Sequence, residues 1–248
     1  MTPKTLHIAK DYAGMSLAAD RFVAKELRRK GKALVCLATG ESPEGLYRLM
    51  VERFHENPGL FGETRFIKLD EWGGLAMSDP GSCEAYVQER VLRPLKITRG
   101  RYFGWNSQPK NPVAECLRVA DWLVANGPVD INILGIGRNG HLGLNEPAAT
   151  LQAGPHVAVL SKTSMGHSML SSRKGAVEYG LTLGMGDLMQ SRKIVMLVSG
   201  RHKAAPLRRM LSGEITTRFP ASLLMGHPEL HVFCDESAAA LLPSSSSS

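Results

Sequence analysis

Short apolar runs alternate with helical patterns along almost the whole chain. Continuous apolar runs are typical of strands buried on both faces, and a helix between two strands supplies the long connection that a parallel pair requires. The alternation therefore predicts an α/β fold with a mainly parallel sheet flanked by helices. The expected strands cover residues 5–9, 33–38, 65–70, 130–136, 156–160, 193–199 and 231–235, and the expected helices cover residues 11–31, 42–54, 111–127 and 203–211.

Local signals mark the ends of these helices. Gly31 and Gly127 follow the last periodic residues of their helices and are typical C-terminal stops. Ser42 is the expected N-cap of the helix that follows it, with Pro43 at the first helical position. No internal repeat or linker interrupts the pattern, so we expect one domain over residues 1–242. The Ser-rich tail, residues 243–248, is expected to be disordered.

Composition narrows the choice of partners. No apolar run approaches the ~20 residues of a membrane-spanning helix, and the first residues lack the apolar segment of a signal peptide. The four cysteines are scattered, so we expect reduced, mostly buried thiols in a cytoplasmic protein rather than zinc ligands. The net charge of +7 fits an anionic partner. Because the basic residues are mostly dispersed, we expect a small anionic substrate, and neither a nucleic acid nor a membrane.

Four expected strands end in polar segments, and the carboxyl ends of parallel strands share one edge of a sheet. The segments begin at Thr39, Asp70, Gly137 and Ser199. Thr39-Gly40-Glu41-Ser42 precedes a helix and is a candidate cradle for an anion, because small residues expose backbone N–H groups there. Lys203 adds a cation at the start of another helix. Taken alone, each of these two segments is more often a plain strand–helix turn than a binding site.

Acid–base side chains occur at the same edge. Asp70 is a candidate general base if its surroundings raise its pKa, although an aspartate at a strand end often only caps a turn. His141 and Glu146 flank a Gly-rich segment. A lone histidine is more often structural than catalytic, but a histidine with two acids at one edge favours acid–base chemistry.

The segment Gly135-x-Gly137-x-x-Gly140 has the spacing of a dinucleotide-binding fingerprint. That fingerprint needs a helix directly after the glycines and an acid at the end of the next strand. Gly143 and Pro147 interrupt any such helix, and the next expected strand ends in Ser161. We therefore expect a loop that approaches something else closely, with no nucleotide.

With these residues assembled, the chain resembles the glucosamine-6-phosphate deaminase/isomerase family, and the related galactosamine-6-phosphate isomerases more closely still. The resemblance rests on four motifs in order over nearly the whole chain: TG-x-[ST]-P, LDEW, G-x-G-x-[DN]-GH-x-x-x-NEP and G-x-x-K. It implies a single Rossmann-like domain with a lid segment after the GxGxNGH loop, and it implies no metal or organic cofactor.

The resemblance also implies a reaction, in which a hexosamine 6-phosphate ring opens, the C2 proton moves through a cis-enediol, and ammonia leaves a ketose 6-phosphate. By position, Asp70 matches the base for the C2 proton, and His141 matches the ring-opening acid/base, with Asn139 beside it and Glu146 as its supporting acid. The remaining matches are to phosphate and substrate binding: Thr39, Gly40, Ser42, Gly137 and Lys203.

Departures from the family pattern qualify these implications. Asn139 stands where the deaminases usually have aspartate and the galactosamine-type relatives tend to have asparagine, which favours galactosamine 6-phosphate over glucosamine 6-phosphate. Glu41 replaces a small residue. The position of the family's phosphate-binding lid arginine falls near Leu170, so that arginine is missing here. His167, Arg173 and Lys174 are the candidate substitutes. The allosteric arginine and lysine of the regulated deaminases are replaced by His156 and Ala158, and their loss predicts an unregulated enzyme. A homo-oligomer is possible.

Two other readings stay open. The sister 6-phosphogluconolactonases share the histidine loop, but they follow it with a different sequence in place of Asn145-Glu146-Pro147. The third reading is a sugar-phosphate-binding protein without catalysis, against which Asp70, His141 and Glu146 argue.

Overall fold

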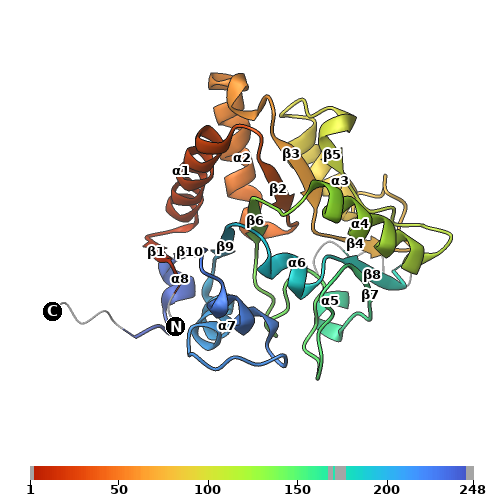
Figure 1. The fold of residues 1–248 in the computed structure, drawn as a ribbon. Helices are drawn as coiled ribbons and strands as arrows, with labels where there is room; N and C mark the ends of the chain where they lie inside the picture. Colours follow the sequence, from red (N-terminus) through yellow and green to blue (C-terminus); the bar gives the residue numbers. More distant parts are fainter. Residues whose placement is uncertain (1–2, 167–169, 171–176, 244–248) are drawn as a thin grey trace.

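The computed structural model describes residues 3–166, 170 and 177–243. Its main sheet has seven strands, all parallel, in the order β1-β10-β9-β6-β2-β3-β5 (Figure 1). These strands are β1 (Thr5–Ala9), β2 (Leu34–Leu37), β3 (Arg65–Lys68), β5 (Tyr102–Phe103), β6 (Ile131–Leu134), β9 (Ile194–Val198) and β10 (Leu230–Asp235). The predicted α/β fold with a mainly parallel sheet is confirmed.

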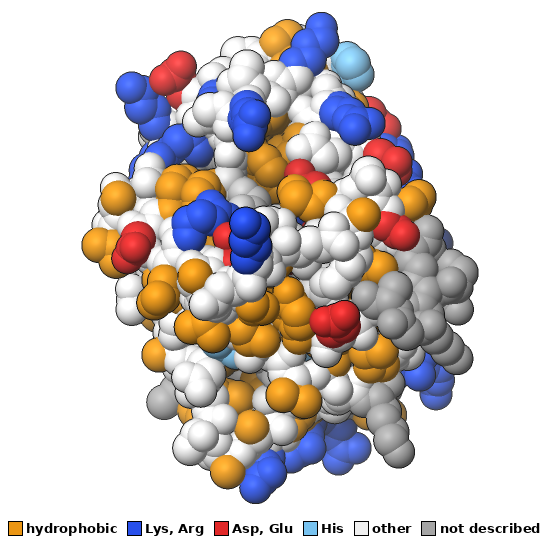
Figure 2. All heavy atoms as spheres, turned by 90° about the vertical axis from the view of Figure 1, so that its right-hand side faces the viewer, with side chains coloured by type: hydrophobic (Ala, Val, Ile, Leu, Met, Phe, Trp, Pro, Cys, Tyr) orange, Lys and Arg blue, Asp and Glu red, His pale blue; other side chains and the backbone are white. Residues whose placement is uncertain are grey.

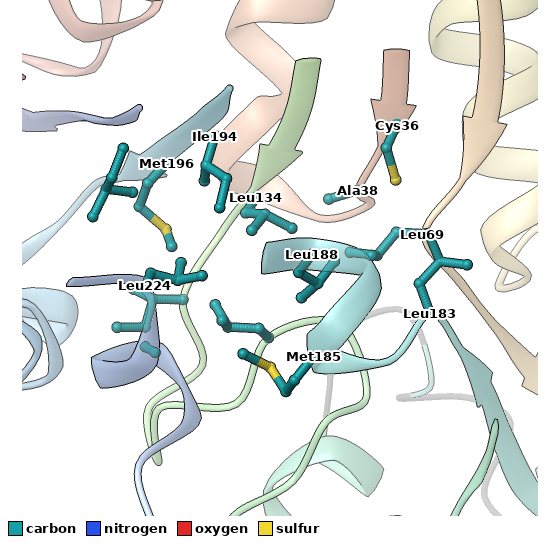
Figure 3. Packing of buried hydrophobic residues seen from close by; sticks show 14 of the residues in the cluster. Cys36, Ala38, Leu69, Leu134, Leu183, Met185, Leu188, Ile194, Met196 and Leu224 are labelled. Atoms are coloured by element: carbon teal, nitrogen blue, oxygen red, sulfur yellow. The ribbon is translucent and has the colours of Figure 1, made fainter. Parts of the chain in front are cut away.

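The strands divide their side chains between two apolar layers because successive residues point to opposite faces of a sheet. In β2, Leu34 and Cys36 belong to one buried cluster, and Val35 and Leu37 belong to the other. Figure 3 shows the first of these clusters, where side chains from the sheet meet those of a helix that carries Leu188. Burial on both faces explains why the central strands appear in the sequence as continuous apolar runs.

Helices cover both faces of the main sheet. The helices α1 and α2 cover the face of the sheet to which Val35 and Leu37 of β2 point (Figure 1). The helices α4, α6, α7 and α8 cover the opposite face (Figure 1). The α-helices are α1 (Tyr12–Lys30), α2 (Glu41–Glu56), α3 (Cys83–Val87), α4 (Pro112–Asn126), α5 (Lys162–Met165), α6 (Met185–Met189), α7 (Ala204–Met210) and α8 (Glu236–Ala239).

The remaining helical segments are short. They are the 3₁₀ segments η1 (Pro58–Phe61), η3 (Arg99–Arg101), η5 (Arg201–Lys203) and η6 (Pro220–Gly226) and the π-helical turn η2 (Gln88–Leu92).

The helix boundaries follow local chemistry, with one correction. Gly31 and Gly127 are the C-caps of α1 and α4, as predicted. The prediction that Ser42 is the N-cap of α2 is wrong: the cap is Gly40, and the helix begins at Glu41. Gly40 has φ of 103°, a conformation that glycine adopts without a steric penalty, so the chain turns into the helix earlier than a serine cap would place it.

A second sheet was not predicted. The strands β4 (Asp70–Gly73), β8 (Tyr179–Thr182) and β7 (His156–Ala158) form an antiparallel sheet in the order β4-β8-β7. The expected strand over residues 65–70 therefore ends at Lys68, and the chain crosses into the second sheet after Leu69. The expected strand over residues 156–160 belongs to the second sheet, because one side of β7 faces solvent and half-buried strands suit antiparallel pairing.

The edge strand β1 also departs from the prediction of strands buried on both faces. Four of its five residues are exposed, and only Ala9 is buried. It pairs with β10 alone, so one edge and much of its surface are open to solvent. The four cysteines are free and buried, as predicted.

The topology places a crevice at the centre of the sheet. From β2 the chain moves outward to β3 and β5, then returns to β6 on the other side of β2 and continues to β9 and β10. The loops after β2 and β6 therefore leave in opposite directions. In open parallel sheets, ligands bind at such a switch point, beyond the carboxyl ends of the strands.

The charged side chains on the surface do not gather into one patch on the face that Figure 2 shows. Lys and Arg side chains on the face in Figure 2 lie in several separate groups, with acidic and apolar side chains between them. In the part of the chain that the structure describes, no helix is both long and apolar enough to cross a membrane. Residues 244–248 of the Ser-rich tail lie outside the described residues.

Candidate active site

A pocket of about 840 Å³ lies beyond the carboxyl ends of β2, β6 and β9. All four polar strand-end segments reach it, which confirms that they share one edge of the fold. The predicted residues that line it are Thr39, Gly40, Ser42, Asp70, Gly137, His141 and Lys203. The other two, Asn139 and Glu146, do not line the pocket and instead hydrogen-bond behind His141 and to each other.

Asp70 is the first residue of β4, where it pairs with Thr182 of β8. Its side chain borders the pocket, yet the residue is only 8% exposed, and its Oδ1 atom has no hydrogen-bond partner among the described residues. Burial raises the pKa of Asp70 to about 7, and the negative charge of Glu71 adds to this effect against the opposing charge of Lys68. A carboxylate with such a pKa is well matched to general base catalysis near neutral pH.

Glu71 does not share the pocket with Asp70. Its Oε1 atom accepts hydrogen bonds from the backbone N–H groups of Trp72 and Cys83, both at 2.8 Å, and its Oε2 atom accepts one from Glu84, also at 2.8 Å. Oε2 also forms an ion pair with the fully buried Lys68. The two carboxylates that are adjacent in the sequence thus have separate roles: Asp70 borders the pocket, and Glu71 anchors the start of α3.

His141 is held by an amide. Its Nδ1 atom lies 2.7 Å from Oδ1 of Asn139, and the amide nitrogen of Asn139 donates to Oε2 of Glu146 at 2.9 Å. Because a carboxylate only accepts hydrogen bonds, the amide must turn its nitrogen to Glu146 and its oxygen to the imidazole. Oδ1 in turn only accepts, so the neutral ring carries its proton on Nδ1. Nε2 is then the unprotonated nitrogen, the form that a general base requires.

The second carboxylate oxygen of Glu146 is held by two serines, one in α5 and one directly before that helix. Oε1 of Glu146 accepts hydrogen bonds from the hydroxyl groups of Ser161 (2.8 Å) and Ser164. Burial tends to raise the pKa of Glu146, but the Ser164 hydroxyl, the positive charge of protonated His141 and the Asn139 amide together hold that pKa below its usual value. The carboxylate therefore stays ionised, and it lies 3.7 Å from Nδ1 of His141.

The other end of the pocket suits an anion. The first turn of the 16-residue helix α2 opens onto it, and no side chain caps that turn. The Lys203 ammonium donates to the carbonyl oxygen of Ile136 at 2.7 Å, which fixes it beside the loop after β6. Burial and the charge of Arg138 lower the pKa of Lys203, and Glu41 opposes them.

Two glycines of the fingerprint-like segment leave space for neighbouring rings, one of which is the imidazole of His141. A Cβ atom on Gly137 would lie 2.4 Å from the imidazole ring. Gly140 has φ of +84°, and a Cβ atom there would lie 2.4 Å from the ring of Phe219. No helix follows directly, as predicted, because the next helix is α5. The spacing thus makes room for a histidine and a turn.

Some residues at the site were missed by sequence reasoning. Ser164, Arg138 and His202 also line the pocket. Arg138 and His202 lie inside motifs that the sequence analysis singled out, whereas Ser164 carries no local signal. Of the lid positions, Leu170 is buried, and His167, Arg173 and Lys174 lie outside the described residues. Within the described part of the chain, no group of three or more His, Cys, Asp or Glu side chains could hold a metal ion.

Comparisons with known proteins agree with this architecture. The chain is 35% identical over 224 residues to the "Putative deaminase AgaI" of Escherichia coli strain K12, covering 90% of this chain and 89% of that protein. It is 35% identical over 235 residues to glucosamine-6-phosphate deaminase 1 of Bacillus subtilis strain 168, covering 94% and 97%.

Solved structures give the same result. A monomeric glucosamine-6-phosphate deaminase of the NagB superfamily matches with a TM-score of 0.89 and 33% identity, covering 96% of this chain and 99% of that one. A 6-phosphogluconolactonase of Trypanosoma brucei matches with a TM-score of 0.78 at 19% identity, covering 98% and 100%, which indicates a shared fold. The model of the family "Glucosamine-6-phosphate isomerases/6-phosphogluconolactonase" matches residues 13–232, and the chain belongs to that family.

Proposed function

We propose that the protein converts a hexosamine 6-phosphate into a ketohexose 6-phosphate and ammonia. The observation that carries this proposal is the pair of acid–base groups on one pocket: Asp70, whose pKa burial raises to about 7, and His141, whose tautomer the amide of Asn139 fixes. Proton transfers at carbon and at the ring oxygen need two such groups.

Ring opening is the first step. The proton on the C1 hydroxyl leaves as the C1–O5 bond breaks, and a proton is delivered to O5, so the ring yields an open-chain aldehyde. His141 takes and returns this proton. Asn139 and Glu146 support the step, because an ionised carboxylate 3.7 Å from Nδ1 stabilises the positive charge that the ring gains on protonation.

Isomerisation follows at C2. Asp70 in its ionised form removes the C2 proton, the C1=C2 double bond forms as the C1=O double bond opens, and O1 takes a proton from solvent water to give an enol that bears the amine. Protonated Asp70 then returns its proton to C1, which gives a C2 iminium group, and water adds at C2 and expels the nitrogen, leaving the ketone, ammonia and a proton released to solvent. The buried, partner-free Oδ1 atom of Asp70 suits this role, because no hydrogen bond to another described residue competes for its lone pairs.

The phosphate of this substrate would lie at the other end of the pocket. Thr39, Gly40 and Ser42 contribute the turn into α2, and Gly137 brings the neighbouring loop close to it. Lys203 supplies the charge. Helix N-termini and lysine ammonium groups are common phosphate ligands. The mechanism assigns no role to a metal or an organic cofactor.

Galactosamine 6-phosphate is the preferred substrate in this proposal, because Asn139 follows the pattern of the galactosamine-type relatives. The expected location is the cytoplasm, because the four scattered cysteines are free and buried. The neutral His141 could also activate water toward a lactone, and the shared fold with 6-phosphogluconolactonases makes this the alternative activity to test.

The test is ammonia release from the purified protein with galactosamine 6-phosphate and glucosamine 6-phosphate in parallel. Ammonia from either sugar, lost in Asp70→Asn, supports the proposal, and the ratio of the two rates identifies the preferred epimer. Release of acid from 6-phosphogluconolactone, with no ammonia from either amino sugar, would replace the proposal with the lactonase activity. Binding without turnover of any of the three would indicate a binding protein.

A further inference from the structure

Arg138 is a pocket residue to which the proposed mechanism gives no role. It lies between β6 and His141, and its side chain is exposed where it borders the pocket. Among the described residues, no carboxylate lies within ion-pair distance of its guanidinium group. Several other arginines differ in this respect: Arg53 pairs with Asp20, and Arg118 pairs with Glu115.

Arg138 shares this end of the pocket with two other basic side chains. Lys203 is hydrogen-bonded to the carbonyl of Ile136, two positions before Arg138, and His202 also borders the pocket. All three residues line the same pocket. Burial and then the charge of Arg138 lower the pKa of Lys203, and burial, the charge of Lys203 and then that of Arg138 lower the pKa of His202. Like charges gathered in a pocket repel one another until an anion occupies it.

Acidic side chains also lie here: Glu41 and Glu44 line the pocket, and the charge of Asp235 acts on His202. Glu41, for which the resemblance does not account, is the acid that acts on Lys203. Its carboxylate raises the pKa values of Lys203 and His202, against the effects of burial and of Arg138. Glu41 therefore helps to keep Lys203 protonated in a pocket that carries a second fixed cation. The pocket end thus combines an ammonium group, a guanidinium group and the uncapped start of α2.

We propose that Arg138 binds the phosphate of the substrate together with Lys203. A guanidinium group can donate two parallel hydrogen bonds to phosphate oxygens, whereas an ammonium group acts as a point charge. Arg138 thus fixes the orientation of the phosphate, and with it the distance of C2 from Asp70. This inference rests on the proposed function for the identity of the anion as a sugar phosphate.

The test uses inorganic phosphate as the probe, because its binding does not depend on turnover. Calorimetric titration compares the full chain with Arg138→Gln, Arg138→Lys and the control Arg201→Gln. Arg201 is exposed and lies in η5, directly before His202, but it does not line the pocket. We expect Arg138→Gln to weaken phosphate binding roughly tenfold to a hundredfold, the usual effect of losing a charge-assisted hydrogen bond. Arg138→Lys should be intermediate and Arg201→Gln unchanged.

Equal phosphate affinity in Arg138→Gln and the unchanged protein would overturn the inference, and so would equal weakening by Arg138→Gln and Arg201→Gln. Absence of phosphate binding by the unchanged protein would overturn it as well. If Arg138-dependent phosphate binding is found but no amino sugar phosphate releases ammonia, the inference stands and the proposed function fails. If ammonia is released, KM should rise in Arg138→Gln by a similar factor, with a smaller change in kcat.

Discussion

At the scale of single residues, the pH dependence of turnover tests Asp70. The base must be ionised to take a proton, and burial raises its pKa to about 7. We therefore expect kcat/KM to fall as the pH is lowered through about 7. An acid limb near pH 4, the range of an ordinary aspartate, would contradict this assignment.

Glu71 provides a second residue-scale prediction, because its negative charge raises the pKa of Asp70. Glu71→Gln removes that charge, so the acid limb of the pH–rate profile should move to lower pH. The matched control is Glu63→Gln, which changes an exposed glutamate paired with Lys32 at 3.6 Å and should leave the limb in place. An unmoved limb in Glu71→Gln would show that the charge of Glu71 does not contribute to this pKa.

At the scale of elements, the junction of β3, β4 and α3 depends on Lys68. This fully buried ammonium contacts the carboxylates of Glu71 and Glu84, and Tyr102 donates to Glu84 at 2.6 Å. Because the charges are buried together, removing the cation leaves two acids without compensation. Burial tends to lower the pKa of Lys68, but the charges of Glu71 and Glu84 raise that pKa above its usual value, so the ammonium group stays charged.

Lys68→Met should therefore lower the free energy of unfolding by about 3–5 kcal/mol, measured by urea denaturation. Lys32→Met, at an exposed ion pair, is the control and should cost at most ~1 kcal/mol. Similar losses in the two variants would show that the buried cluster contributes no more than a surface pair.

The helix α5 contacts the carboxylate of Glu146 through the side chain of Ser164. Ser164 lines the pocket and donates to Glu146, whose pKa it helps to lower. Ser164→Ala should raise that pKa and reduce kcat roughly tenfold, the order expected for one hydrogen bond to a charged group. Ser164→Thr, which keeps the hydroxyl, should recover most of the loss, and Ser212→Ala on the exposed surface should be neutral. Failure of the threonine variant to recover activity would indicate a packing role for Ser164.

At the scale of the whole molecule, we expect turnover without cooperativity. The positions that the family resemblance assigns to allosteric cations hold His156 and Ala158, both on β7. Burial lowers the pKa of His156, so the ring is neutral at pH 7, and Ala158 is apolar. Initial rates should therefore follow a hyperbola in substrate concentration. A sigmoidal curve that N-acetylglucosamine 6-phosphate converts to a hyperbola would contradict this expectation.

The sequence by itself determined the fold class and the convergence of the site. Continuous apolar runs specify strands buried on both faces, and the helices between them specify parallel pairing, so polar residues at the strand ends had to meet at one edge. Local signals also placed the ends of α1 and α4, because a glycine at a helix end acts through its own backbone. The reason is physical: these features depend on neighbours in the sequence.

Only the tertiary structure decided which of those residues share the pocket and how each is charged. It separated Asp70 from Glu71 by beginning a second sheet at Asp70, and β8, more than a hundred residues later in the chain, pairs with that strand. It brought Ser164 to Glu146 and placed Arg138 and Lys203 in the lining of one pocket. Burial and hydrogen bonds set these pKa values, and both depend on residues distant in the sequence, which no local pattern records.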